Sequence, residues 1–197
     1  MRCFAAALAL SALAACDPSA MATGSTSRQT VSVAGREVTV AAPSGLCIDA
    51  PSTRVEPLGA FLLLKDCGAT AATGLAMTAS VSSHGLGGSG PATEATLASL
   101  RRYLDTPQGR AMAGRSGRAG GVRIVADQVS GDVLFVLVED RGPQPIAGLD
   151  RQFWRAILEV NGRMTVLSAL GFGPVPPDEE LTALAAFASS IRAANPA

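Results

Sequence analysis

The fold is decided by residues 153–170, which read FWRAILEVNGRMTVLSAL. Asn161-Gly162 separates two apolar runs, and this dipeptide is the strongest short-range indication of a two-residue, type I′ β-hairpin. In that register Val160 pairs with Arg163, and Trp154 pairs with Ala169. Side chains alternate between the two faces of a strand, so one face carries Trp154, Ala156 and Leu158 and the other carries Phe153, Ile157 and Val166. Both faces of the hairpin are therefore largely apolar. We therefore expect a sheet covered on both sides, or covered on one side and closed on the other.

Further strands precede this hairpin. The runs 122–129 and 133–139 flank Ser130-Gly131-Asp132, which predicts a second hairpin. Residues 30–41 alternate valines around Ala34-Gly35 and predict a third. Short strands are expected at 46–48, 59–65 and 75–83, with a polar loop over 50–57.

Two helices are predicted, over about 92–105 and 178–194. The first carries leucines at positions 97, 100 and 104, one face of a helix. The second follows Pro176-Pro177, with Asp178 as its expected N-cap and Glu179 and Glu180 at its positive end. Residues 106–109 are expected to end or kink the first helix, and 110–121 to form an irregular connection, with one helical turn as the alternative.

This order of elements predicts an α+β fold, an antiparallel β-sheet built largely of hairpins with two packed helices. Over residues 29–194 the order resembles that of the Mog1/PsbP-like α+β sandwiches. The resemblance is one of topology and implies neither a function nor any site residue.

The N-terminus carries a different pattern. Arg2 precedes an apolar run over 4–12, too short for a membrane span of about 20 residues. Leu13-Ala14-Ala15-Cys16 ends this run and resembles the lipobox of bacterial lipoproteins. The resemblance implies a signal peptide over 1–15, acylated Cys16 as the new N-terminus, and a flexible tether over 16–28. A plain signal peptide with a chance cysteine is the alternative.

The leader therefore predicts a lipid-anchored protein of the cell envelope. Residues 29–197 are then a single periplasmic α+β domain, attached to a membrane through the lipid anchor. Asp17 directly follows the lipobox cysteine and resembles an inner-membrane retention signal.

Of the four cysteines, Cys3 lies in the signal peptide and Cys16 carries the lipid. In an oxidising compartment the other two, Cys47 and Cys67, are expected to form a disulfide. The whole chain has a formal net charge of zero, which argues against nucleic-acid binding.

Enzyme and cofactor motifs are weak. Residues 85–90 match G-x-G-x-x-G, but no acidic residue follows at the spacing expected of a dinucleotide site. His84 is the only histidine, which excludes a multi-histidine metal centre. We expect no cofactor, no metal and no catalytic residue.

One charged segment is a candidate contact for an anionic surface. Residues 101–123 contain six arginines and a single acid, Asp105. A solvated face balanced by acids elsewhere is the plainer interpretation, and a contact with anionic headgroups is the functional one. Three further arginines lie at the hairpin, and the sequence does not assign them to this charged segment: Arg151, Arg155 and Arg163. The arginines of the segment are Arg101, Arg102, Arg110, Arg115, Arg118 and Arg123.

Three functions are carried forward. The first is a non-catalytic module that binds an envelope protein or an anionic envelope surface. The second is a periplasmic module that binds a small ligand between sheet and helices. The third, a hydrolase without a recognisable motif, is the least supported.

Overall fold

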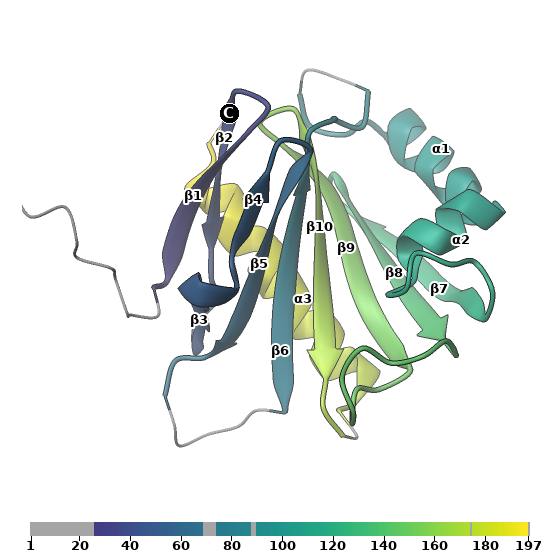
Figure 1. Ribbon diagram of the computed structural model, residues 1–197. Coiled ribbons are helices and arrows are strands. Elements are labelled where there is room, and N and C mark those ends of the chain that lie inside the picture. Colours follow the sequence, from purple (N-terminus) through teal and green to yellow (C-terminus); the bar gives the residue numbers. More distant parts are fainter. Residues whose placement is uncertain (1–25, 69–73, 88–89, 174, 197) are drawn as a thin grey trace, which may run out of the picture.

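Figure 1 shows the computed structural model of the chain, which describes residues 26–68, 74–87, 90–173 and 175–196. Its main sheet is antiparallel throughout, so the predicted α+β fold is confirmed. In spatial order its strands are β3 (Leu46–Ile48), β5 (Gly59–Asp66), β6 (Leu75–Ser82), β10 (Arg163–Gly171), β9 (Gln152–Val160), β8 (Val133–Asp140) and β7 (Val122–Ser130), and β4 (Arg54–Glu56) also pairs with β5. The other elements are the hairpin β1 (Arg28–Val33) and β2 (Arg36–Ala41), the 3-10 helix η1 (Ala50–Ser52), and the helices α1 (Glu94–Leu104), α2 (Pro107–Ala113) and α3 (Pro177–Ala194).

The central hairpin forms as predicted near its turn. Asn161 and Gly162 both have positive φ, 50° and 72°, as a type I′ turn requires. Val160 pairs with Arg163, but the β9–β10 ladder ends at Arg155 and Ser168. The expected Trp154–Ala169 pair is therefore absent from the described ladder.

A buried carboxylate lies where that ladder stops. Glu180 of α3 is only 2% exposed. The backbone N–H groups of Trp154 and Gly171 favour the charged form of its carboxylate and so lower its pKa, against the larger effect of burial. Glu180 lies in the first turn of α3, at the positive helix end as predicted, and it is also buried. Asp178 is not the expected N-cap, since α3 begins at Pro177 and Asp178 lies in its first turn.

The sheet separates two hydrophobic cores. On one face α3 and the β1–β2 hairpin enclose the larger core, which takes Trp154, Ala156, Leu158 and Val160 from β9. On the other face the leucines of α1 pack with Leu134, Phe153 and Ile157 of β8 and β9. Each leucine buried in this way contributes about 2 kcal/mol relative to an exposed one.

Helix α2 replaces the irregular connection expected after α1. The Thr106 side chain accepts a hydrogen bond from the Gly109 amide at 3.1 Å, and Pro107 occupies the first turn. Proline suits the first turn of a helix as well as it ends the preceding one, so Pro107 starts α2. A Cβ at Gly109 would lie 2.0 Å from the Tyr103 carbonyl oxygen, so this packing requires glycine.

One half of the second face is left open. Helices α1 and α2 lie over β7, β8 and β9, while α3 runs behind the sheet (Figure 1). On the uncovered side Phe61 of β5 is 39% exposed. The expected covering of both faces therefore holds for β8 and β9 but not for β5, β6 and β10.

The N-terminal half is fixed by a disulfide and an edge contact. Cys47 of β3 is bonded to Cys67, directly after β5, which confirms the predicted pair. The Ile48 amide donates to the Thr26 carbonyl at 2.7 Å, so ordered structure begins before Gln29. The signal peptide, the lipobox and Cys16 lie outside the described residues. Among the described helices, none is long and apolar enough to cross a membrane.

Candidate functional site

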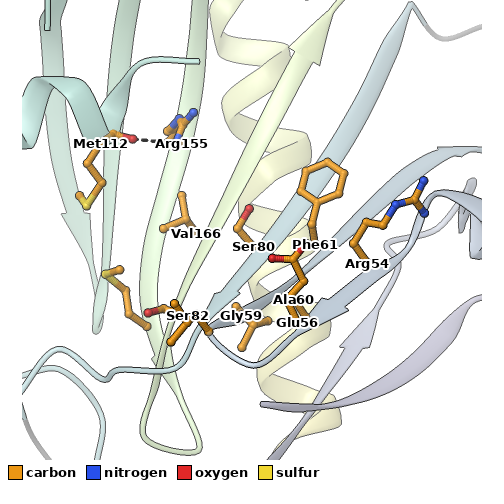
Figure 2. Close-up of a pocket in the computed structure, with 13 residues that line it drawn as sticks. Arg54, Glu56, Gly59, Ala60, Phe61, Ser80, Ser82, Met112, Arg155 and Val166 are labelled. Atoms are coloured by element: carbon orange, nitrogen blue, oxygen red, sulfur yellow. Dashed lines mark hydrogen bonds between the residues drawn. The ribbon is translucent and has the colours of Figure 1, made fainter. Parts of the chain in front are cut away.

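Strand alternation places one set of side chains on the open half of the sheet. Arg54 pairs with Phe61, Phe61 with Ser80, and Ser80 with Val166, which forms a row across β4, β5, β6 and β10. Figure 2 shows this row, with Arg155 of β9 beyond Val166. We call the surface lined by Arg54, Phe61, Ser80, Val166 and Arg155 the sheet groove.

The sheet groove consists of two adjoining hollows that share Arg54, Phe61, Ser80 and Arg155. The first has a volume of about 580 Å³ and reaches Met112 of α2 and Met164 of β10. The second has a volume of about 600 Å³ and extends to Arg115 and to the loop before β9. Both volumes fall within the roughly 300–1,000 Å³ of small-molecule sites.

Arg155 closes one end of the sheet groove. Its guanidinium donates to the carbonyl oxygens of Met112 and Gly114, each at 3.2 Å (Figure 2 marks the first bond). Its buried Nε has no acceptor among the described residues. Burial, and then the like charge of Arg115, lower the pKa of Arg155 to about 10, so it remains a cation at neutral pH.

Arg115 lies beside it as a second half-buried cation. One guanidinium nitrogen donates to the Gln144 side chain at 2.5 Å and to the Asp150 carbonyl at 2.6 Å. The other nitrogen and Nε are buried without a described acceptor. Burial also lowers the pKa of Arg115.

The nearest buried acid is already engaged by the backbone. Asp140 accepts hydrogen bonds from the amides of Arg115 and Gly142, both at 2.8 Å. It acts on the two guanidinium groups only at longer range. In the described part of the chain neither Arg115 nor Arg155 forms an ion pair.

Hydroxyl groups line the floor of the sheet groove between Arg155 and Arg54. Ser168 is the cross-strand neighbour of Arg155, and Thr78 is the neighbour of Ser168. The side chains of Thr78, Ser80 and Ser168 make no hydrogen bond to another described residue. The groove end near Arg155 therefore offers several donors, while Asp140, the acid that acts on both arginines, is already engaged by backbone amides.

The arginine-rich segment does not gather around this groove. Arg101 is paired with Asp127, and Arg123 with Glu139 at 2.7 Å. Arg102 donates to Ser99 on its own helix, Arg110 donates to the Asp105 carbonyl, and Arg118 is exposed. Only Arg115 of the six lines the sheet groove. Contact of the other five with an anionic surface stays a prediction.

Arg155 was left unplaced by the sequence, although a signal for it exists. It alternates with Phe153, Ile157 and Glu159 on one face of β9, and both apolar neighbours are buried. An arginine between two buried apolar residues needs acceptors or a water-filled groove. The sequence predicts at most one helical turn for α2, the helix that supplies those acceptors.

The glycine-rich stretch offers little to a phosphate. The Leu86 amide donates to the Glu159 carboxylate at 2.5 Å, so this amide is not free to bind a phosphate. Gly88 and Ser89 lie outside the described residues. Across the part of the chain that the structure describes, no three His, Cys, Asp or Glu side chains gather in a metal-like cluster.

Comparisons of the chain with protein-family models, with curated proteins and with solved structures returned no match.

Proposed function

We propose that the protein is a lipid-anchored, non-catalytic binding module of the cell envelope that uses the sheet groove as its binding site. The observation that carries the proposal is the open half of the sheet, where strands β4 to β6 and β10 present side chains that none of the described helices covers. Two large apolar side chains of the first hollow, Leu58 and Phe61, are 76% and 39% exposed, and a ligand in the hollow would cover them. The anchor rests on the lipobox resemblance at Cys16.

A small ligand suits the sheet groove better than a large protein surface. The groove is concave, with apolar walls from Phe61, Val166 and Met164 and a few polar groups that converge at one end. This combination is typical of small-molecule sites, whereas protein interfaces are flatter and larger. The ligand-binding function is therefore preferred over partner binding.

Catalysis has less support. Nucleophilic catalysis by a hydroxyl needs an adjacent base within hydrogen-bond reach. Within the described residues, the hydroxyls of Thr78, Ser80 and Ser168 contact no histidine, lysine or carboxylate. A hydrolase would therefore need a base that the sheet groove does not bring to its hydroxyls.

The sheet groove is tested by photo-cross-linking. Replacing Ser80 with a photoreactive benzoylphenylalanine should give a cross-linked adduct in intact cells, because Ser80 lies on the groove floor. The same group at Gln128, exposed on the edge strand β7, should give none. Equal labelling at both positions, or none at Ser80, would refute the groove as the binding site.

The lipid anchor is tested separately. Cys16→Ala should move the protein from the membrane fraction to the soluble periplasm, and continued membrane association would refute the anchor.

A further inference from the structure

We infer that the sheet groove takes an anionic amphiphile, with its carboxylate or phosphate head beside Arg115 and Arg155 and its apolar chain along Phe61 and Val166. The inference rests on the proposed function, because it names the ligand class of the same groove. It goes further in assigning a polarity to the groove, with a head end and a chain end.

Charge decides the head group. The like charge of Arg115 disfavours the charged form of Arg155, and neither arginine forms an ion pair among the described residues. Three of their buried N–H positions, two on Arg115 and one on Arg155, have no described acceptor. Asp140 acts on both guanidinium groups, and Asp150 and Glu180 act on Arg115, but none of these acids forms an ion pair with either arginine among the described residues. A half-buried cation without a direct partner gains from an anion that accepts charge-assisted hydrogen bonds.

The hydroxyl groups fit the same head group. Ser168 and Thr78 follow Arg155 along one cross-strand row, and both face the second hollow. Hydroxyls and guanidinium groups are donors, so this end offers donors to several oxygen atoms of one anion. A cationic head would meet two like charges here, and a neutral head would leave them unpaired.

The chain end is apolar. From Arg155 the groove runs across Val166 and Phe61 towards Arg54 on β4 (Figure 2). Four inter-strand spacings separate β9 from β4, a span of about 19 Å. Met112 and Met164 add flexible apolar walls of the kind that adapt to alkyl chains. Arg54 at the far end is exposed and already donates to the carbonyls of Pro51 and Thr53, so the chain end opens to solvent.

Calorimetric titration of the soluble Cys16→Ala protein tests this assignment. The probes, below their micellar concentrations, are decanoate, decyl phosphate, neutral decyl maltoside and cationic decyltrimethylammonium, with acetate and inorganic phosphate as heads without a chain. We expect decanoate and decyl phosphate to bind at least tenfold more tightly than the neutral or cationic probes. Acetate and phosphate alone should bind at least tenfold more weakly than their decyl counterparts.

Variants separate the head contact from general stickiness. Arg155→Gln should weaken decanoate binding at least tenfold and leave the affinity for decyl maltoside unchanged. Arg155→Lys, which keeps the positive charge, should bind decanoate more tightly than Arg155→Gln. Arg102→Gln, which removes the same charge from exposed α1, should change nothing. Thermal melting of each variant establishes that it is folded before titration.

The outcomes distinguish this inference from the proposed function. Equal affinity for anionic and neutral probes, with no effect of Arg155→Gln, overturns the anionic head but leaves the groove as a binding site. Binding of acetate or phosphate as tight as that of the decyl probes overturns the apolar chain. If no probe binds, the amphiphile is overturned, and the Ser80 cross-link alone decides whether the groove binds anything.

Discussion

Arg115 and Arg155 both place their guanidinium groups against the ring of Phe153, 3.9 Å and 5.4 Å from its centroid. A ring face attracts cations, so Phe153 offsets part of the repulsion between these two. It cannot replace a counter-ion, because a cation–π contact contributes only about 1–2 kcal/mol. The structure thus keeps two cations together beside an open groove.

Stability measurements separate a ligand-binding arginine from a structural one. Replacing Arg155 with methionine removes the cost of a half-buried cation but also removes its two hydrogen bonds to the Met112 and Gly114 carbonyls, so the two effects should offset each other. We expect Arg155→Met to change the free energy of unfolding of the ligand-free protein by less than about 1 kcal/mol. Urea denaturation measures this difference.

Arg192 provides the matched control. It is also half-buried, but it pairs with Asp132 and donates to the Glu159 carbonyl at 2.5 Å. Arg192→Met should therefore cost about 2 kcal/mol or more. If Arg155→Met cost as much as Arg192→Met, Arg155 would be a structural residue and its charge would need no ligand.

Glu180 predicts a pH dependence of stability. Burial is the main reason that the pKa of Glu180 rises from 4.5 to about 7, and nearby Asp150 adds to it. A raised pKa in the folded state means that the folded protein holds this proton more tightly than the unfolded chain. The stabilisation is therefore complete below about pH 4.5 and is lost as the pH rises through about 7.

The variant Glu180→Gln keeps the protonated shape at every pH. It should be more stable than wild type by about 2 kcal/mol at pH 8, and the difference should shrink towards pH 5. Glu179→Gln, an exposed neighbour in the same turn, is the control. Urea unfolding at several pH values measures both, and a pH-independent difference for Glu180→Gln would contradict the raised pKa.

The disulfide should contribute measurably to stability. Cys47 and Cys67 are separated by 20 residues, and closing such a loop is worth about 3 kcal/mol on the chain-entropy model. Replacing both cysteines with serine should lower the free energy of unfolding by that amount. An unchanged value in non-reducing urea denaturation would show that the β3–β5 contact does not need the bond.

Asn195 attaches the end of α3 to the β1–β2 hairpin. Its side chain accepts from the Thr39 amide at 2.9 Å and donates to the Thr39 carbonyl at 2.7 Å. Asn195→Ala leaves both groups of Thr39 without these partners and should cost about 2 kcal/mol. Hydrogen exchange should then rise in β2 first. Faster exchange spread evenly over the sheet would contradict a local attachment.

The sequence predicts strands better than their covering. Asn161-Gly162 specifies its hairpin locally, because asparagine and glycine both adopt positive φ readily. The hairpin at Ala34-Gly35 is predicted by the flanking valines, and Ala34 takes a φ of 49° that alanine rarely adopts. The two helices with leucine or alanine stripes were also found. For α2 the sequence indicates at most one helical turn after residue 110, because Pro107 marks a helix end as readily as a helix start.

The groove could not be predicted because it depends on where the helices stop. The same alternation that buries Phe153 under α1 leaves Phe61 exposed, and nothing within either strand records that difference. Glu180 shows the same limit. Its place in the first turn of α3 follows from the sequence, whereas its burial depends on tertiary packing against the end of the β9–β10 ladder.

Methionine methyl NMR during a titration with decanoate tests the central claim most directly. Met112 and Met164 line the sheet groove, whereas Met77 is 1% exposed in the core on the opposite face. We predict that the Met112 and Met164 signals shift with saturation and that the Met77 signal does not. Unchanged Met112 and Met164 signals in a titration that saturates by calorimetry, or a shift confined to Met77, would contradict ligand binding in the groove.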